Sequence, residues 1–137
     1  MSDPVVTLVI PARSEYLILA RLALAGIARE VAMSDETLSD LKLAVTEACA
    51  NAVAHAYGDG HGTVEVRYVV SPGSVTIEVQ DDGERETPEV PATMPALDGE
   101  ALPESGMGLA IIQAIVDELE VEARDGTGTV VRLVKRL

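Results

Sequence analysis

Aromatic residues are scarce in this sequence, which contains no phenylalanine, no tryptophan and only three tyrosines. Its hydrophobic content of 47% nevertheless argues against a disordered chain. A folded core must therefore be built from Val, Leu, Ile and Ala, which pack through many small aliphatic contacts. With 137 residues, the chain is predicted to form a single domain over residues 1–137.

Positive charge and cysteine are also scarce. Ten Lys and Arg residues stand against 23 Asp and Glu residues, which gives a formal net charge of −13. Because DNA and RNA binding depends on clustered Lys and Arg, we expect no nucleic-acid partner, and a basic or neutral protein partner is favoured. The single cysteine, Cys49, cannot form an internal disulfide and is expected to pack as a small apolar residue.

Long apolar segments are lacking as well. No apolar run reaches the length that spans a membrane, and the N-terminus lacks the charged and apolar regions of a signal peptide. We therefore expect a cytoplasmic protein with no membrane partner.

The hydrophobic pattern predicts an α/β fold with the order β-α-α-β-β-loop-α-β-β. Predicted strands alternate apolar and polar residues, whereas predicted helices repeat apolar residues every three or four positions. The predicted segments are a strand over 5–10, helices over 14–32 and from 34 or 35 toward 57, strands over 63–70 and 74–80, a helix over 107–119, and strands over 120–124 and 129–137. This order predicts a two-layer sandwich of helices on a mixed, largely antiparallel sheet.

Two local signals mark a helix start and a hairpin, and the hairpin is the clearest strand signal. Ser34 or Asp35 can cap the second helix, and the residues Ser71-Pro72-Gly73 join two β-branched segments as a hairpin. Between Asp82 and Ser105, four prolines and scattered acidic residues show no periodicity, which predicts a long loop.

Three separate patches carry residue types that suit a nucleotide. Glu47 and Asn51 are four residues apart on a predicted helix, so they share a face, and a carboxylate beside an amide oxygen suits Mg²⁺. Asp81 ends a predicted strand and could accept a hydrogen bond from an exocyclic amine such as that of adenine, while Gly83 lets the backbone approach the ring. The stretch Ser105-Gly106-Met107-Gly108 opens a helix whose unpaired amides and dipole favour an anion.

Each patch alone also has an ordinary structural interpretation. The three alternatives are a solvated helix face, a strand-ending Asp-Gly turn and a plain helix start. The sequence contains no Walker motif, no dinucleotide fingerprint, no Cys/His cluster with zinc spacing and no evident Ser-His-Asp arrangement. A nucleotide site in this chain would therefore need another kind of fold.

Taken in order, four segments resemble the N-box, the first and second glycine boxes and the final Gly-Thr strand of GHKL-type ATPases. These segments are TEACANAVAHAY, VTIEVQDDG, ESGMGLAI and GTGTVVRLVKRL. Among such ATPases, the chain most resembles the bacterial anti-sigma-factor serine/threonine kinases of partner-switching pathways. The resemblance spans nearly the whole chain and implies a histidine kinase-like ATPase fold, with the ATP lid at about residues 84–105.

The resemblance also implies ATP and Mg²⁺ as cofactors and assigns roles to individual residues. Asn51 would ligate Mg²⁺, and Glu47 would be the general base that takes the proton from an incoming serine hydroxyl. Asp81 would bind the adenine amine, with Gly83 beside the ring and Thr129 supporting the adenine end. The backbone amides that would hold the phosphates belong to Ser105, Gly106, Met107 and Gly108.

The implied function is that of an ATP-dependent anti-sigma factor. It would sequester a sigma factor, phosphorylate a serine or threonine on an anti-anti-sigma (STAS-type) protein, and form a homodimer. An alternative is a nucleotide-gated partner-switching protein without kinase activity. Two departures from the family pattern support this alternative: Arg85 stands at the second glycine of the first glycine box, and Glu104 stands where close relatives often carry a basic residue.

Overall fold

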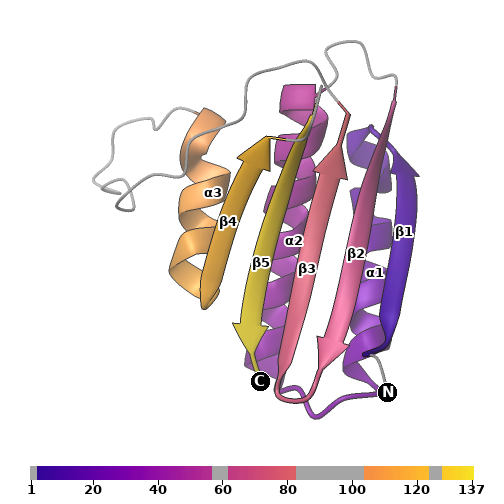
Figure 1. Ribbon diagram of the computed structural model, residues 1–137, viewed down its shortest axis with the longest axis vertical. Helices are drawn as coiled ribbons and strands as arrows, with labels where there is room; N and C mark the ends of the chain where they lie inside the picture. The colour runs from indigo at the N-terminus through magenta and orange to yellow at the C-terminus, as the bar shows by residue number, and fades with distance from the viewer. Residues whose placement is uncertain (1–2, 57–61, 83–103, 124–127) are drawn as a thin grey trace.

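A five-stranded sheet covered on one face by helices makes up the computed structural model, in which residues 3–56, 62–82, 104–123 and 128–137 are described (Figure 1). The elements in chain order are β1 (Val5–Pro11), a 3₁₀ turn (Ser14–Tyr16), α1 (Leu17–Ala28), α2 (Asp35–Ala56), β2 (Thr63–Ser71), β3 (Ser74–Asp81), α3 (Glu104–Ile115), β4 (Glu118–Ala123) and β5 (Thr129–Arg136). The strand order is β1-β2-β3-β5-β4, and all four neighbouring pairs are antiparallel. The predicted two-layer α/β sandwich with a largely antiparallel sheet is confirmed.

The structure confirms two local sequence signals, the cap of α2 and the hairpin. The hydroxyl oxygen of Ser34 accepts a hydrogen bond from the backbone N–H of Thr37 at 3.1 Å, so Ser34 is the residue that caps α2. The predicted hairpin is β2 and β3, in which Ser71 pairs with Ser74 across the turn. Gly73 has a φ of 79°, which a residue with a side chain adopts at a cost.

The prediction was wrong about the two ends of the first helix, which was expected over 14–32. A 3₁₀ turn precedes α1, and α1 ends at Ala28. At that end the backbone N–H of Arg29 bonds the carbonyls of Gly26 and Ile27, which closes the helix with a tightened last turn.

The boundary between α3 and β4 also differs from the prediction, which continued the helix to Leu119. The helix starts at Glu104 and ends at Ile115, and β4 already starts at Glu118. Two contacts with β5 mark the end of α3. Lys135 Nζ donates to the carbonyl oxygen of Ile115 at 2.7 Å, and the N–H of Asp117 donates to the carbonyl of Val134 at 2.9 Å. Apolar residues that alternate with glutamates then follow as a strand.

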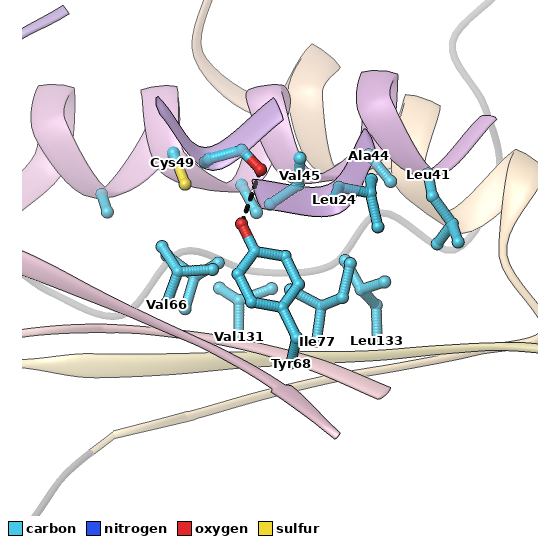
Figure 2. Packing of buried hydrophobic residues seen from close by; sticks show 14 of the residues in the cluster. Leu24, Leu41, Ala44, Val45, Cys49, Val66, Tyr68, Ile77, Val131 and Leu133 are labelled. Atoms are coloured by element: carbon cyan, nitrogen blue, oxygen red, sulfur yellow. Dashed lines mark hydrogen bonds between the residues drawn. The ribbon is translucent and has the colours of Figure 1, made fainter. Parts of the chain in front are cut away.

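The core between the two layers is almost entirely aliphatic, as the composition predicts (Figure 2). Tyr68 is the exception: it is fully buried, and its hydroxyl donates a 2.6 Å hydrogen bond to the carbonyl oxygen of Ala20, which ties β2 to α1. Cys49 is also fully buried, as expected for a small apolar residue, and burial raises the pKa of its thiol to about 12. Burial, and secondly the neighbouring Cys49, raise the pKa of Tyr68, so both side chains are neutral near pH 7.

The face of the sheet opposite the helices is charged. Arg132 on β5 lies 3.6 Å from Glu120 on β4 and 3.9 Å from Glu78 on β3, and Arg67 on β2 lies 3.5 Å from the other oxygen of Glu78. Such half-exposed pairs each stabilise a fold by about 1 kcal/mol or less. Among the described helices, none is both long and apolar enough to cross a membrane.

Candidate nucleotide site

Four element ends meet at one end of the molecule. Figure 1 shows the end of α2, the end of β3, the beginning of α3 and the beginning of β5 at the same end of the sandwich. Within the sheet, the antiparallel register places Asp81 directly opposite Thr129. The predicted nucleotide-site residues on these four elements, which are far apart in the sequence, therefore lie at the same end of the molecule.

The predicted pair on α2 faces the predicted glycine on α3. A β-carbon added to Gly108 would lie 3.1 Å from Glu47 Oε2, 3.4 Å from Asn51 Nδ2 and 3.5 Å from Asn51 Oδ1. Gly108 itself is buried. The missing side chain at Gly108 thus lets α3 approach the carboxylate and the amide, which puts three of the predicted site residues in one cluster.

The side-chain amide of Asn51 is incompletely satisfied. Its Nδ2 atom is buried and has no hydrogen-bond partner in the described part of the chain. An unpaired buried amide costs about 1 to 3 kcal/mol, so proteins rarely keep one without a functional reason. A ligand that enters beside Gly108 could accept this hydrogen bond.

Asp81 and Thr129 form a second cluster on neighbouring strands. Both are buried, with exposed fractions of 7% and 6%. Next to them, Gly128 has a φ of 97°, and a β-carbon on it would lie 2.0 Å from the carbonyl oxygen of Asp81. Only glycine permits this close approach, so Gly128 allows the two backbones to lie against each other here.

The predicted phosphate-binding stretch lies in the first turns of α3, which begins at Glu104. Ser105 and Gly106 fall in the first turn, where backbone amides have no acceptor within the helix, and Met107 follows them. Gly108 lies one turn into the helix, where its lack of a side chain leaves room for Glu47 and Asn51. Gly83 and nearly all of the predicted lid, about residues 84–105, lie outside the described residues.

The far end of α3 is fixed by charge and packing. Besides its hydrogen bond to the Ile115 carbonyl, Lys135 lies 3.8 Å from Asp40 of α2, so one ammonium group joins α3, α2 and β5. Leu109 and Ile112 of α3 are fully buried. These contacts hold α3 against α2 and thereby fix the distance between Gly108 and Glu47.

Sequence reasoning missed the roles of Gly128 and Lys135. For Gly128 a signal existed, because this glycine directly precedes Thr129 in the GTGTVVRLVKRL segment, but no role in the site was inferred for it. For Lys135 no local signal existed, because its two partners lie 20 and 95 residues away in the chain.

The amide oxygen of Asn51 also suits a hard cation such as Mg²⁺ that is bound together with phosphate groups. Among the described residues, no group of three or more His, Cys, Asp or Glu side chains could hold a metal ion. Mg²⁺ commonly takes one or two protein oxygens and completes its shell with water and phosphate oxygens. The amide oxygen of Asn51 is an atom of that kind.

Comparisons with known proteins show the family of this chain. The model of the histidine kinase-like ATPase domain matches residues 10–135. The chain is 39% identical over 125 residues to "Serine-protein kinase RsbW" of Bacillus pumilus, covering 85% of this chain and 77% of that protein. It is 37% identical over 118 residues to "Anti-sigma F factor" of Caldanaerobacter subterraneus, covering 85% of this chain and 82% of that protein.

A solved structure agrees at the level of the fold. The crystal structure of the RsbU and RsbW domains of Rv1364c from Mycobacterium tuberculosis superposes with a TM-score of 0.72 at 22% identity, covering 98% of this chain and 32% of that chain. The resemblance that the sequence motifs suggested is therefore confirmed, and the chain belongs to the histidine kinase-like ATPase domain family.

Proposed function

We propose that this protein is an ATP-dependent anti-sigma factor and protein serine/threonine kinase of the partner-switching type. Relatives at 35% to 39% identity are named serine-protein kinase or anti-sigma F factor, which supports both activities. Its partners are a sigma factor, which it sequesters, and an anti-anti-sigma protein of the STAS type, which it phosphorylates. Its working place is the cytoplasm, and it acts as a homodimer.

A single observation carries the kinase proposal. Gly108 lies so close to Glu47 and Asn51 that a β-carbon there would meet both side chains within 3.5 Å. A family-typical glycine of the second glycine box thus adjoins a carboxylate and a buried amide that lacks a partner. This arrangement supports a site for the phosphates, with an acid next to it for the chemistry.

In the proposed reaction, Glu47 is the general base. The serine oxygen of the partner forms a bond to the γ-phosphorus of ATP, and the bond from that phosphorus to the bridging oxygen of ADP breaks. The hydroxyl proton passes to the Glu47 carboxylate, and ADP leaves. Phosphoryl transfer otherwise needs mainly positioning and charge neutralisation. The backbone amides at the start of α3 and the side chain of Asn51 would supply the positioning.

The remaining roles are proposals of the same kind. Mg²⁺, when bound through Asn51, neutralises phosphate charge. Asp81 accepts a hydrogen bond from the adenine amine, with Gly83 beside the ring, and Thr129 supports this end of the nucleotide. The burial of Asp81 and Thr129 opposite each other supports a shared role for them.

The test replaces Glu47 by Gln, which keeps the size and polarity of the side chain but removes the base. A kinase is expected to lose about a hundredfold or more in phosphoryl transfer to an anti-anti-sigma protein. ATP affinity, measured by calorimetry, should remain close to that of the wild type. Equal transfer rates in the two chains would refute the role of Glu47, and no transfer by the wild type would favour the nucleotide-gated binder without kinase activity.

A further inference from the structure

The ammonium group of Lys135 lies where the C-terminal end of α3 meets α2. Its Nζ atom donates a 2.7 Å hydrogen bond to the carbonyl oxygen of Ile115, the last residue of α3, and lies 3.8 Å from Asp40 Oδ2 on α2. The side chain of Lys135 is 20% exposed and that of Asp40 is 33% exposed, so this charge pair is largely shielded from solvent. One side chain of the sheet therefore joins two helices.

The C-terminal end of α3 has no positive charge of its own. The last carbonyl groups of a helix lack donors within the helix and carry a partial negative charge, yet the last turn of α3 contains no basic residue. Lys135 supplies both a donor and a positive charge from β5. Because α3 packs mainly against α2, and its main contact with the sheet is the edge strand β4, the bond from Lys135 ties α3 to an inner strand (Figure 1).

The two contact points between α2 and α3 are equally far apart on both helices. Gly108, whose added β-carbon would lie 3.1 Å from Glu47 Oε2, precedes Ile115 by seven residues. On α2, Asp40 precedes Glu47 by seven residues as well. The helices run in opposite directions, and at 1.5 Å per residue each span is about 10 Å long (Figure 1). The contact of Lys135 at one end is therefore in register with the contact of Gly108 at the other.

A shift of α3 along α2 would disturb the nucleotide site. A shift by one residue along the helix axis is about 1.5 Å. It would move Gly108, together with the first-turn amides of Ser105 and Gly106, by this distance relative to Glu47. A misplacement of about 1 Å can lower a reaction rate about a hundredfold. The axial position of α3 therefore matters for the proposed chemistry.

From these contacts we propose that Lys135 is a positioning residue for phosphoryl transfer. By binding Ile115 and Asp40, it sets the position of α3 along α2. This position aligns the first turns of α3 with Glu47 and Asn51. The inference rests on the proposed kinase function and adds a residue outside the nucleotide site that aligns the groups within it.

Phosphoryl transfer to an anti-anti-sigma protein at saturating ATP tests the proposal in the full chain. Lys135→Met keeps a long unbranched side chain but removes the charge and the donor. We expect its kcat to fall about tenfold or more, because the general base and the phosphate site lose their alignment. Lys135→Arg keeps a positive charge and several donors, and it should retain kcat within about threefold of the wild type.

Tyr68→Phe is the control for stability. It removes one hydrogen bond that ties β2 to α1, whereas Lys135→Met removes one that ties β5 to α3. Each loss should lower Tm by about 3 to 5 °C, so both variants should remain folded at room temperature. A merely structural role of Lys135 predicts near wild-type kcat in both variants. Transfer by Lys135→Met that is as fast as transfer by Tyr68→Phe would therefore overturn the proposal.

The backbone amide signal of Gly108 in nuclear magnetic resonance gives a reading that does not depend on activity. Gly108 is buried against α2, so a displaced α3 changes its surroundings although the substitution lies at the other end of the helix. We expect this signal to move in Lys135→Met and to stay in Tyr68→Phe. Asp40→Asn removes only one of the two contacts at a partly exposed position, and it should move the signal less but in the same direction. A signal that stays in both Lys135→Met and Asp40→Asn would overturn the proposal.

The two readings separate this inference from the proposed function. A wild type that transfers no phosphate would refute the proposed function, and the placement of α3 by Lys135 would then be judged from the Gly108 signal alone. A wild type that transfers phosphate, together with equal transfer and an unmoved signal in Lys135→Met, would refute only the role of Lys135.

Discussion

Replacing Gly108 by Ala should separate stability from activity in this protein. The new β-carbon would lie 3.1 Å from Glu47 Oε2, which is closer than ordinary van der Waals contact, so the carboxylate must move by a few tenths of an ångström. The carboxylate is at the end of a flexible side chain, and this movement therefore costs little folding energy. The same change gains about 1 kcal/mol, because alanine favours a helix interior over glycine.

The expected signature is a protein that is equally or more stable but less active. For a domain of this size, a gain of 1 kcal/mol raises Tm by about 3 to 5 °C. A displaced general base and a filled space beside Asn51 should lower phosphoryl transfer by about tenfold or more, because catalysis depends on sub-ångström placement. Thermal unfolding and transfer of labelled phosphate from ATP to an anti-anti-sigma protein measure the two effects.

Gly26→Ala in α1 is the matched control. A β-carbon at Gly26 meets nothing within 4 Å, so this variant makes the same helical substitution without touching Glu47 or Asn51. It should gain stability and keep full transfer activity. The reasoning would be refuted if Gly108→Ala transferred phosphate and bound ATP as well as Gly26→Ala does.

Two further predictions concern the frame of the site and the core. Gly128→Ala should lower the free energy of unfolding by roughly 3 kcal/mol or more, because its β-carbon would lie 2.0 Å from the carbonyl oxygen of Asp81. Gly73 has a similar positive φ, but a β-carbon there would meet open space. Gly73→Ala should therefore lower the free energy of unfolding by only about 1 to 2 kcal/mol. Equal losses in urea unfolding would contradict the close contact. Burial raises the pKa of Cys49 from 9.0 to about 12, so the unfolded chain releases the thiol proton first and stability falls as pH rises above 9. Between pH 8 and 10 the wild type should lose about 1.4 kcal/mol more than Cys49→Ala, and parallel losses would count against a buried neutral thiol.

The sequence predicted those features that depend on residues only a few positions apart in the chain. The hydroxyl of Ser34 caps α2 from three residues away, and the β2–β3 hairpin turns at Gly73 with the expected pairing. These features depend on interactions between near neighbours in the chain. The sequence alone therefore sufficed to place them.

Contacts between distant residues were not predictable in the same way. The helix α3 stops at Ile115 because Lys135 binds its last carbonyl, and apolar spacing alone would allow the helix to continue. The motifs placed Glu47 and Gly108 in one site, but only the structure shows that the glycine is needed for the close approach of two helices. The tight contact of Gly128 with Asp81 likewise depends on the register of β3 and β5.

The most direct test of the nucleotide site is calorimetry of Mg²⁺-dependent ATP binding by the wild type and by Asn51→Ala. The buried Nδ2 of Asn51 has no hydrogen-bond partner among the described residues, so its removal should not lower the free energy of unfolding. We predict that the wild type binds ATP and that Asn51→Ala loses binding while remaining folded. A wild type that does not bind ATP, or a variant that binds it equally well, would contradict the account.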